Sequence, residues 1–165
     1  MEQIKYSAIG IIRTPFTESR GTPIQSSAGR GVEGSVEIFT EYADGLRDLD
    51  GFSHIILLYH FHRAHPPRLR ATPFLDNVER GIFAIRGPTR PNPIGISIVR
   101  LTKIEGSILN IQDIDIMDGT PLLDIKPYIP KIDSHPGAKI GWLQGKVQRF
   151  SDTEDDGRFS DGIPQ

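Results

Sequence analysis

The sequence contains no cysteine. Its absence excludes disulfide bonds, cysteine-ligated zinc, iron–sulfur clusters and thiol nucleophiles. No run of apolar residues approaches the length of about 18 that a transmembrane helix needs. The chain begins Met-Glu-Gln-Ile-Lys, with an acid where a signal peptide has a basic start and a long apolar stretch. We therefore expect a cytoplasmic protein with no membrane span.

Glycine and proline are frequent, with 17 and 13 residues among 165, above the roughly 12% usual for both together. Isoleucine is also common and outnumbers leucine about two to one. Frequent turns and β-branched side chains favour strands over a helical bundle. The length fits one domain that can bury a core.

Short apolar or alternating segments predict strands over residues 6–12, 35–39, 52–61, 81–85, 95–101, 109–117 and 139–150. Helical spacing appears only over 41–49, and 16–34 is expected to be a long, functional loop. The sequence therefore predicts a mainly β fold: a small β-barrel or strongly curved sheet with one or two short helices and long loops. We expect a barrel domain over 1–150 and a flexible acidic tail over 151–165.

The net charge of −2 hides a strong segregation along the chain. The last fifteen residues hold five acids and one arginine, whereas residues 63–103 hold eight bases and two acids. Seven of those bases are arginine, which suits bidentate contacts to phosphate or carboxylate. Two interpretations stay open, an ordinary solvated surface and a polyanion-binding face. In the second, Arg68 and Arg70 contact the substrate.

Two apparent motifs are interpreted as structural. Gly29-Arg-Gly-Val-Glu-Gly34 matches the dinucleotide fingerprint, but a strand-like segment follows it where that fingerprint needs a helix. His60 and His62 fall on one face of a strand, yet no further ligand of suitable spacing accompanies them. We expect neither a Rossmann site nor a metal site.

Arg86-Gly-Pro-Thr-Arg-Pro-Asn-Pro-Ile-Gly95 is an unusually rigid stretch. Its three prolines fix φ, so the polar side chains would lose little entropy on binding a ligand. We interpret Arg86, Arg90 and Asn92 as binding residues. A rigid connection between two strands is the alternative.

A second stretch rich in candidate functional residues begins at Asp118-Gly-Thr-Pro. These four residues predict a tight turn that presents backbone amides and carbonyls. Asp124 and Lys126 then lie two residues apart, on one side of an extended chain. They offer a base candidate beside a cation. An ion pair that holds the turn is the alternative.

Five collinear motifs resemble the TsaA-like (YaeB/VirR) family. They are Ile9-Gly-Ile-Ile-Arg-Thr-Pro15, Gly51-Phe-Ser-His-Ile55, Phe61-His62, Arg90-Pro-Asn-Pro-Ile-Gly95 and Asp118-Gly-Thr-Pro…Asp124-Ile-Lys-Pro-Tyr-Ile-Pro130. The resemblance runs from about residue 6 to residue 136. That family includes tRNA methyltransferases that use S-adenosylmethionine to modify N6-threonylcarbamoyladenosine at position 37.

The resemblance implies a small β-barrel without a Rossmann fold that forms a homodimer, with S-adenosylmethionine bound near the interface. The implied cofactor contacts are Pro23, Ile24, Gln25, His62, Arg63, Arg86, Ile98, Asp118, Gly119, Thr120 and Pro121. The chain departs from the family pattern at Ile24 and Arg63, where longer bacterial members have arginine and glutamine. Those members also carry an additional C-terminal domain.

The implied substrate is the anticodon stem-loop of tRNA, held by Arg68, Arg70, Arg90 and Asn92. Asp124, Lys126 and Tyr128 project to one side if extended, so we predict that they form the catalytic wall, with Asp124 orienting or deprotonating the nucleophile. Two other functions stay open: a regulatory module that binds S-adenosylmethionine without transferring its methyl group, and a methyltransferase for another substrate.

Overall fold

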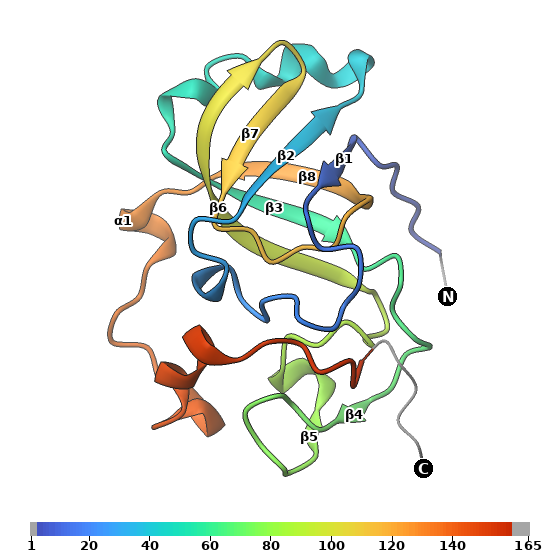
Figure 1. The fold of residues 1–165 in the computed structure, drawn as a ribbon, viewed down its shortest axis with the longest axis vertical. Helices are drawn as coiled ribbons and strands as arrows, with labels where there is room; N and C mark the ends of the chain where they lie inside the picture. Colours follow the sequence, from blue (N-terminus) through green and yellow to red (C-terminus); the bar gives the residue numbers. More distant parts are fainter. Residues whose placement is uncertain (1–2, 160–165) are drawn as a thin grey trace.

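The computed structural model describes residues 3–159, and within them six antiparallel strands close into a barrel in the order β1-β2-β7-β6-β3-β8 (Figure 1). The barrel strands are β1 (Gly10–Arg13), β2 (Glu33–Ile38), β3 (His54–His60), β6 (Ile94–Glu105), β7 (Ile108–Gln112) and β8 (Thr120–Pro127). The predicted small β-barrel is confirmed.

Alternation of side chains builds the barrel core. In β3 and in residues 94–101 of β6 every second residue is buried, and Ile55, Leu57 and Val99 are 0% exposed. Side chains point alternately to the two faces of a strand, so the residues between them face outward. Ile96 and Ile98 are therefore apolar residues on the outer surface, 50% and 38% exposed.

Gly95 shapes one end of the barrel. It lies opposite Tyr59 in the β3–β6 register, and a Cβ atom at this position would overlap the Tyr59 ring. The absence of a side chain lets the ring lie across β6, where its hydroxyl reaches Ser97. The aromatic edge contact of Tyr59 with Phe61 closes this end.

A smaller unit packs beside the barrel (Figure 1). The strands β4 (Arg70–Ala71) and β5 (Arg80–Gly81) pair as a hairpin, and the 3-10 helix η4 (Ile82–Ala84) follows. Ile82, Ile85 and Phe159 form its buried cluster, with Phe74 and Trp142 packed against it. The arginine-rich stretch therefore builds a separate wall next to the barrel.

The remaining elements are short helices: α1 (Pro130–Asp133) and the 3-10 helices η1 (Ser26–Ala28), η2 (Thr40–Leu46), η3 (Leu49–Gly51), η5 (Gly141–Leu143) and η6 (Val147–Asp152). The segment predicted as helical over 41–49 is thus mainly the 3-10 helix η2. None of the helices in the described part of the chain is long and apolar enough to cross a membrane.

Two predicted strands are wrong. The apolar run over 81–85 is mostly the 3-10 helix η4, with Phe83 77% exposed, because so short a run does not distinguish a strand from a helical turn. The segment 139–150 contains η5 and η6. Gly141 and Gly145 there have φ of 58° and 75°, which no strand accommodates.

The strand predicted over 109–117 ends early. β7 stops at Gln112 because Asp113 has a left-handed φ of 65°, which turns the chain across the end of the barrel. Asp113 accepts a hydrogen bond from the Gly31 amide at 2.8 Å, which fixes the turn. The segment 113–119 consequently leads into the site rather than continuing the sheet.

The acidic segment contacts the rest of the chain over its described residues. Asp155 exchanges backbone hydrogen bonds of 2.8 Å with Gly21 and Thr22, and Phe159 is 5% exposed. Residues 160–165 of the predicted tail lie outside the described residues. A domain division at residue 150 stays a prediction.

Candidate functional site

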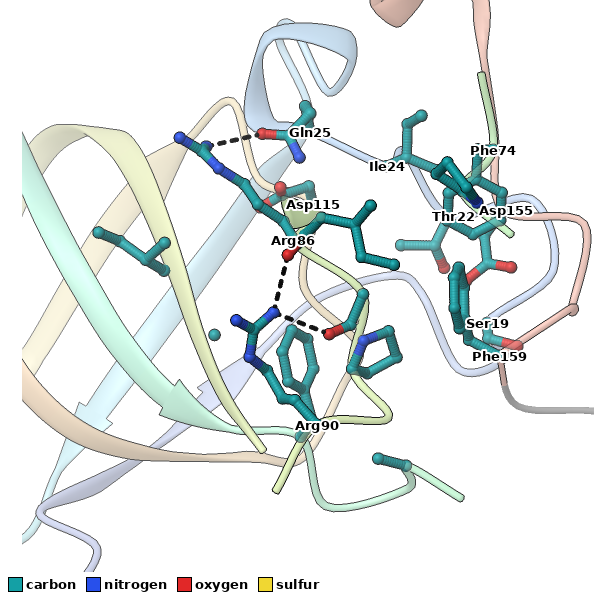
Figure 2. Close-up of a pocket in the computed structure, with 18 of the residues that line it drawn as sticks. Ser19, Thr22, Ile24, Gln25, Phe74, Arg86, Arg90, Asp115, Asp155 and Phe159 are labelled. Carbon is teal, nitrogen blue, oxygen red and sulfur yellow. Dashed lines mark hydrogen bonds between the residues drawn. The ribbon is translucent and has the colours of Figure 1, made fainter. Parts of the chain in front are cut away.

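One end of the barrel opens into a cavity of about 620 Å³, called the pocket below. Its walls come from the loop between β1 and β2, the end of β3, the β4–β5 unit, the loop between β7 and β8, and η5 and η6. A volume of this size is typical of small-molecule sites. Figure 2 shows Arg86, Gln25 and Asp115 on one side and Ile24, Phe74 and Phe159 on the other. The pocket therefore has a polar side and a second side, called the apolar side below, where Ser19, Thr22 and Asp155 lie beside the apolar residues.

The structure brings seven of the eleven predicted cofactor residues to the pocket. They are Pro23, Ile24, Gln25, His62, Arg63, Arg86 and Thr120. They come from four segments far apart in the sequence, which the barrel closure brings together. The four that do not line the pocket are Ile98, Asp118, Gly119 and Pro121.

Arg86 joins two walls of the pocket. Its guanidinium donates a hydrogen bond of 3.3 Å to the Gln25 side-chain oxygen (Figure 2). No carboxylate among the described residues forms an ion pair with Arg86. The guanidinium is therefore available to an anionic group of a ligand.

His62 and Thr120 meet at the opposite edge, where the Thr120 hydroxyl lies 3.4 Å from His62 Nδ1. Partial burial and the neighbouring Arg63 guanidinium lower the pKa of His62 below its ordinary value. The imidazole is consequently neutral at neutral pH. A neutral ring does not repel a cationic ligand.

The turn over 118–121 lies behind the pocket. Asp118 accepts a hydrogen bond of 3.1 Å from the Thr14 amide, and Gly119 has a φ of 74°. The Asp118 amide donates to the Phe16 carbonyl at 2.8 Å. The turn is thus tied to the segment after β1 and supports Thr120.

Sequence reasoning missed a buried polar network at the pocket wall. Ser97 donates a hydrogen bond of 2.6 Å to Asp115 Oδ1, and the Tyr59 hydroxyl lies 3.1 Å from Ser97 Oγ. Ser97 and Tyr59 are 4% and 5% exposed, and both Tyr59 and Asp115 line the pocket. Burial raises the pKa of Asp115 to about 6, against the lowering effects of the Ser97 hydrogen bond and the Arg86 charge.

The network had only a weak signal in the sequence. Asp115 alternates with isoleucine in the segment 109–117, which is typical of an exposed strand residue. The expectation of an exposed strand residue fails because Asp113 has a left-handed φ and turns the segment over the end of the barrel.

The predicted substrate residues are spread over the arginine-rich unit. Arg90 lines the pocket, but its guanidinium donates to the carbonyls of Ile85 at 3.0 Å and Gly87 at 3.2 Å, which holds the rigid loop (Figure 2). Arg68 and Asn92 are exposed outside the pocket. Arg70 is also exposed and pairs with Glu79 at 3.2 Å.

Half of the eight bases over residues 63–103 are neutralised locally. Arg70, Arg80, Arg100 and Lys103 form ion pairs with acids, and Arg90 is bound to backbone carbonyls. Arg63, Arg68 and Arg86 have no ion-pair partner among residues 3–159. The cationic surface is therefore smaller than the sequence count indicates.

The predicted catalytic residues do not line the pocket. Asp124 and Lys126 form an ion pair of 2.8 Å on β8, beside the outward residues of β3. Tyr128 makes an edge contact with His54, with ring centroids 6.4 Å apart. The ion pair between Asp124 and Lys126, which was the alternative interpretation, is thus observed. A catalytic role of Asp124, Lys126 and Tyr128 stays a prediction.

η5 and η6 close the apolar side of the pocket. Trp142 donates from Nε1 to the Ala84 carbonyl at 2.7 Å, and the cations of Arg80 and Lys146 lie 5.5 and 5.7 Å from its ring centroid. Asp76 accepts from both cations, which hold the pKa of its carboxyl well below the usual range. This cluster fixes η5 over the β4–β5 unit.

The apparent nucleotide motif connects η1 to β2, as expected, and no helix follows it. A Cβ atom at Gly29 would overlap the Ile114 carbonyl, and Gly31 has a φ of 76°. These glycines serve packing and a turn. Within residues 3–159 no group of three or more His, Asp or Glu side chains is arranged to hold a metal ion.

The family of tRNA-methyltransferase O N-terminal domains matches residues 11–134. The chain belongs to this family. The matched residues carry most of the barrel and the β4–β5 unit and end before η5 and η6. The resemblance stated from the sequence motifs is thereby confirmed.

Similar proteins cover most of the chain. A probable S-adenosyl-L-methionine-binding protein of Pyrococcus abyssi is 53% identical over 156 residues, which are 94% of this chain and 85% of that protein. A tRNA (adenine(37)-N6)-methyltransferase of Escherichia coli is 35% identical over 159 residues, covering 87% of this chain and 66% of that protein.

A crystal structure of TrmO from Pseudomonas aeruginosa has a TM-score of 0.73 and 36% identity. The match covers 86% of this chain and 63% of that one. The chain therefore spans less than two thirds of the length of that TrmO structure.

Proposed function

We propose that this protein transfers a methyl group from S-adenosylmethionine to tRNA, at N6 of the adenosine at position 37, with N6-threonylcarbamoyladenosine as the substrate nucleoside. The observation that carries the proposal is the convergence of Gln25, His62, Arg86 and Thr120 on one pocket. The names of the Pyrococcus and Escherichia relatives support the cofactor and the reaction class.

The groups around the pocket fit S-adenosylmethionine. Arg86 acts on Asp115 only through its charge and forms no ion pair among the described residues, so it suits a carboxylate, while neutral His62 tolerates a nearby sulfonium. The apolar side, with Ile24, Phe74 and Phe159, suits a flat aromatic base. When bound, the cofactor supplies an electrophilic methyl group.

The pocket mouth also suits RNA. Phe83 lines the pocket and is 77% exposed, so its ring is accessible for stacking on a base. Arg63 and Arg68, on the same stretch of chain, are exposed cations without acidic partners among residues 3–159. We assign Arg68 to a phosphate of the anticodon stem-loop and keep Arg63 as a cofactor contact at the pocket. Arg70 is held partly by Glu79.

A homodimer would explain the residues left outside the pocket. On the outer surface of the barrel, Ile96 and Ile98 of β6 lie opposite Leu58 and Ile56 of β3. On the other side of β3, Ile56 lies opposite Lys126 of β8. This outer isoleucine face is contiguous with the Asp124–Lys126 pair. Packing two such faces together buries the isoleucines and brings Ile98 and the predicted catalytic residues of one copy toward the other.

Sedimentation of the unaltered chain and of Ile98→Glu, a change outside the pocket, tests the dimer. We expect a dimer that the charge converts to a monomer, because the buried face cannot hold an unpaired carboxylate. A monomeric unaltered chain would contradict this part of the proposal.

Incubation with bulk tRNA and S-adenosylmethionine labelled in its methyl group tests the function. Label in RNA is the expected result. Binding of the cofactor with no label in any RNA would instead identify a regulatory module. The cytoplasm stays the predicted compartment.

A further inference from the structure

Asp115 is a charged group in the pocket wall to which the cofactor and RNA contacts above give no role. It lies on the segment 113–119, where the left-handed Asp113 turns the chain across the open end of the barrel. Its carboxylate accepts the Ser97 hydroxyl at 2.6 Å and lies on the same side of the pocket as Arg86 (Figure 2). A carboxylate is therefore fixed where the predicted cofactor residues converge.

The hydrogen bonds around Asp115 have one consistent direction. Ser97 has a single hydroxyl proton, which it donates to the carboxylate, so the Tyr59 hydroxyl must donate to Ser97 Oγ at 3.1 Å. Burial raises the pKa of Tyr59 far above its ordinary value, so the phenol keeps its proton. Ser97 consequently donates to the Asp115 carboxylate, and Tyr59 fixes the orientation of the Ser97 hydroxyl.

This arrangement is costly if Asp115 is only structural. A carboxylate withdrawn from water destabilises the folded state unless partners compensate for the lost hydration. The groups that face it are the Ser97 hydroxyl from β6, the Tyr59 phenol from β3, the Arg86 guanidinium and the Ser26 amide from η1. Burial outweighs the lowering effects of Ser97, Arg86 and Ser26 and leaves the pKa of Asp115 raised to about 6. A carboxyl with that pKa accepts a proton readily at neutral pH.

We propose that Asp115 accepts the proton released by the nitrogen that is methylated, and that Ser97 and Tyr59 are positioning residues for its carboxylate. The assignment rests on the proposed methyl transfer to an exocyclic adenine nitrogen. It replaces Asp124 as the base, because Asp115 lies in the pocket wall, whereas the Asp124 carboxylate is paired with Lys126.

The proton balance requires such an acceptor. The N6 nitrogen of a carbamoylated adenosine carries one hydrogen, and its lone pair is delocalised. As nitrogen forms its bond to the methyl group, the sulfur–methyl bond breaks and its electron pair stays on sulfur. The N6–H bonding pair remains on nitrogen as the proton moves to the Asp115 carboxylate. Methylated nucleoside, neutral thioether and protonated Asp115 are the products, and solvent then takes the proton.

Three matched variants test the assignment in methyl transfer to tRNA. Asp115→Asn keeps the acceptor for Ser97 and removes the basic oxygen. Asp113→Asn changes an acid two residues away that pairs with Arg100 outside the pocket, and asparagine tolerates its left-handed φ. Asp124→Asn tests the earlier assignment directly.

We expect Asp115→Asn to lower the transfer rate by ~10²–10⁴-fold with cofactor binding retained, because general-base assistance contributes about that much. Asp113→Asn is expected to leave the rate unchanged. The rate of the unaltered chain should fall with unit slope below pH 6, and that limb should vanish in Asp115→Asn.

A second readout does not depend on turnover. Carbon-13 NMR of aspartate-labelled protein should show one carboxyl that titrates near pH 6 and is missing from Asp115→Asn. Ser97→Ala should move that midpoint to higher pH, because the Ser97 hydrogen bond lowers the Asp115 pKa. Ser97→Thr, which keeps the hydroxyl, should restore the midpoint.

Three results would overturn the assignment. They are an unimpaired rate in Asp115→Asn, a loss of rate in Asp124→Asn alone, and no aspartate carboxyl titrating near pH 6. If the unaltered chain binds the cofactor but labels no tRNA, the proposed function fails and the base assignment fails with it. Transfer that survives Asp115→Asn refutes only the base assignment.

Discussion

The ring of Tyr59 lies against Gly95 on the neighbouring strand, where any side chain would overlap it. The ring position brings the Tyr59 hydroxyl to Ser97, and Ser97 in turn holds Asp115. A glycine on β6 thus determines the geometry of a carboxylate in the pocket.

Gly95→Ala should destabilise the fold, because the added methyl group displaces a buried ring. Overpacking of this kind costs roughly 1–3 kcal/mol. Urea unfolding measures the loss, and Gly81→Ala, at a position with open space around it, is the matched control. Equal stability of the two variants would show that the ring moves aside freely.

Arg86→Ala should remove most of the thermal stabilisation that S-adenosylmethionine gives. A ligand that binds only the folded state raises its melting temperature, and Arg86 supplies a guanidinium that forms no ion pair among the described residues. Differential scanning fluorimetry with and without the cofactor provides the measurement. Arg100→Ala, which alters a paired arginine outside the pocket, should retain the shift. An intact shift in Arg86→Ala would remove Arg86 from the cofactor site.

Asp115→Asn should be more stable than the unaltered chain at neutral pH. The pKa of Asp115 is raised from 3.8 to about 6 in the folded state, so the folded chain binds more protons than the unfolded chain between these values. Stability from this group is therefore present below pH 4 and is lost as the pH rises through 6. The shift corresponds to about 3 kcal/mol at most.

Thermal unfolding from pH 4 to pH 8 measures this linkage. The melting temperatures of Asp115→Asn and the unaltered chain should be close at pH 4 and should separate up to pH 7. A constant difference across the range would mean that Asp115 keeps an ordinary pKa.

Binding of tRNA should weaken steeply with salt, because each neutralised phosphate releases counterions. Arg68→Gln should reduce the slope of log affinity against log salt by about one. Arg70→Gln should change it less, because Glu79 already neutralises Arg70 at 3.2 Å. Filter binding over a salt series compares the two, and a slope unaffected by Arg68→Gln would show that this arginine is only solvated.

The barrel was predictable because alternation in β3 and β6 follows directly from burial on one face of each strand. The end of β7 was not predictable, because the left-handed conformation of the single residue Asp113 leaves no pattern in the sequence. Because of the same turn, the position of Asp115 in the pocket wall was not predictable, since the sequence pattern predicts a solvent-facing strand residue there.

Some residues of the pocket were likewise predictable from the sequence and others were not. The cofactor candidates Gln25, His62 and Arg86 came from the family resemblance, and the barrel brings them together. Trp142 and the apolar wall of η5 and η6 lack such motifs, since their position depends on tertiary contacts such as the Lys146–Asp76 ion pair. Asp124 was chosen for its neighbours in sequence, and the ion pair with Lys126 shows that this spacing suits a local contact as well.

The most direct test of the account is the identity of the nucleoside that the protein modifies. Purified chain is incubated with S-adenosylmethionine and two tRNA transcripts, one carrying N6-threonylcarbamoyladenosine at position 37 and the other unmodified adenosine. The RNA is then digested and analysed by mass spectrometry. The account predicts a single added methyl group on N6-threonylcarbamoyladenosine in the first tRNA and none in the second. Methylation of another nucleoside, or of neither tRNA, would contradict it.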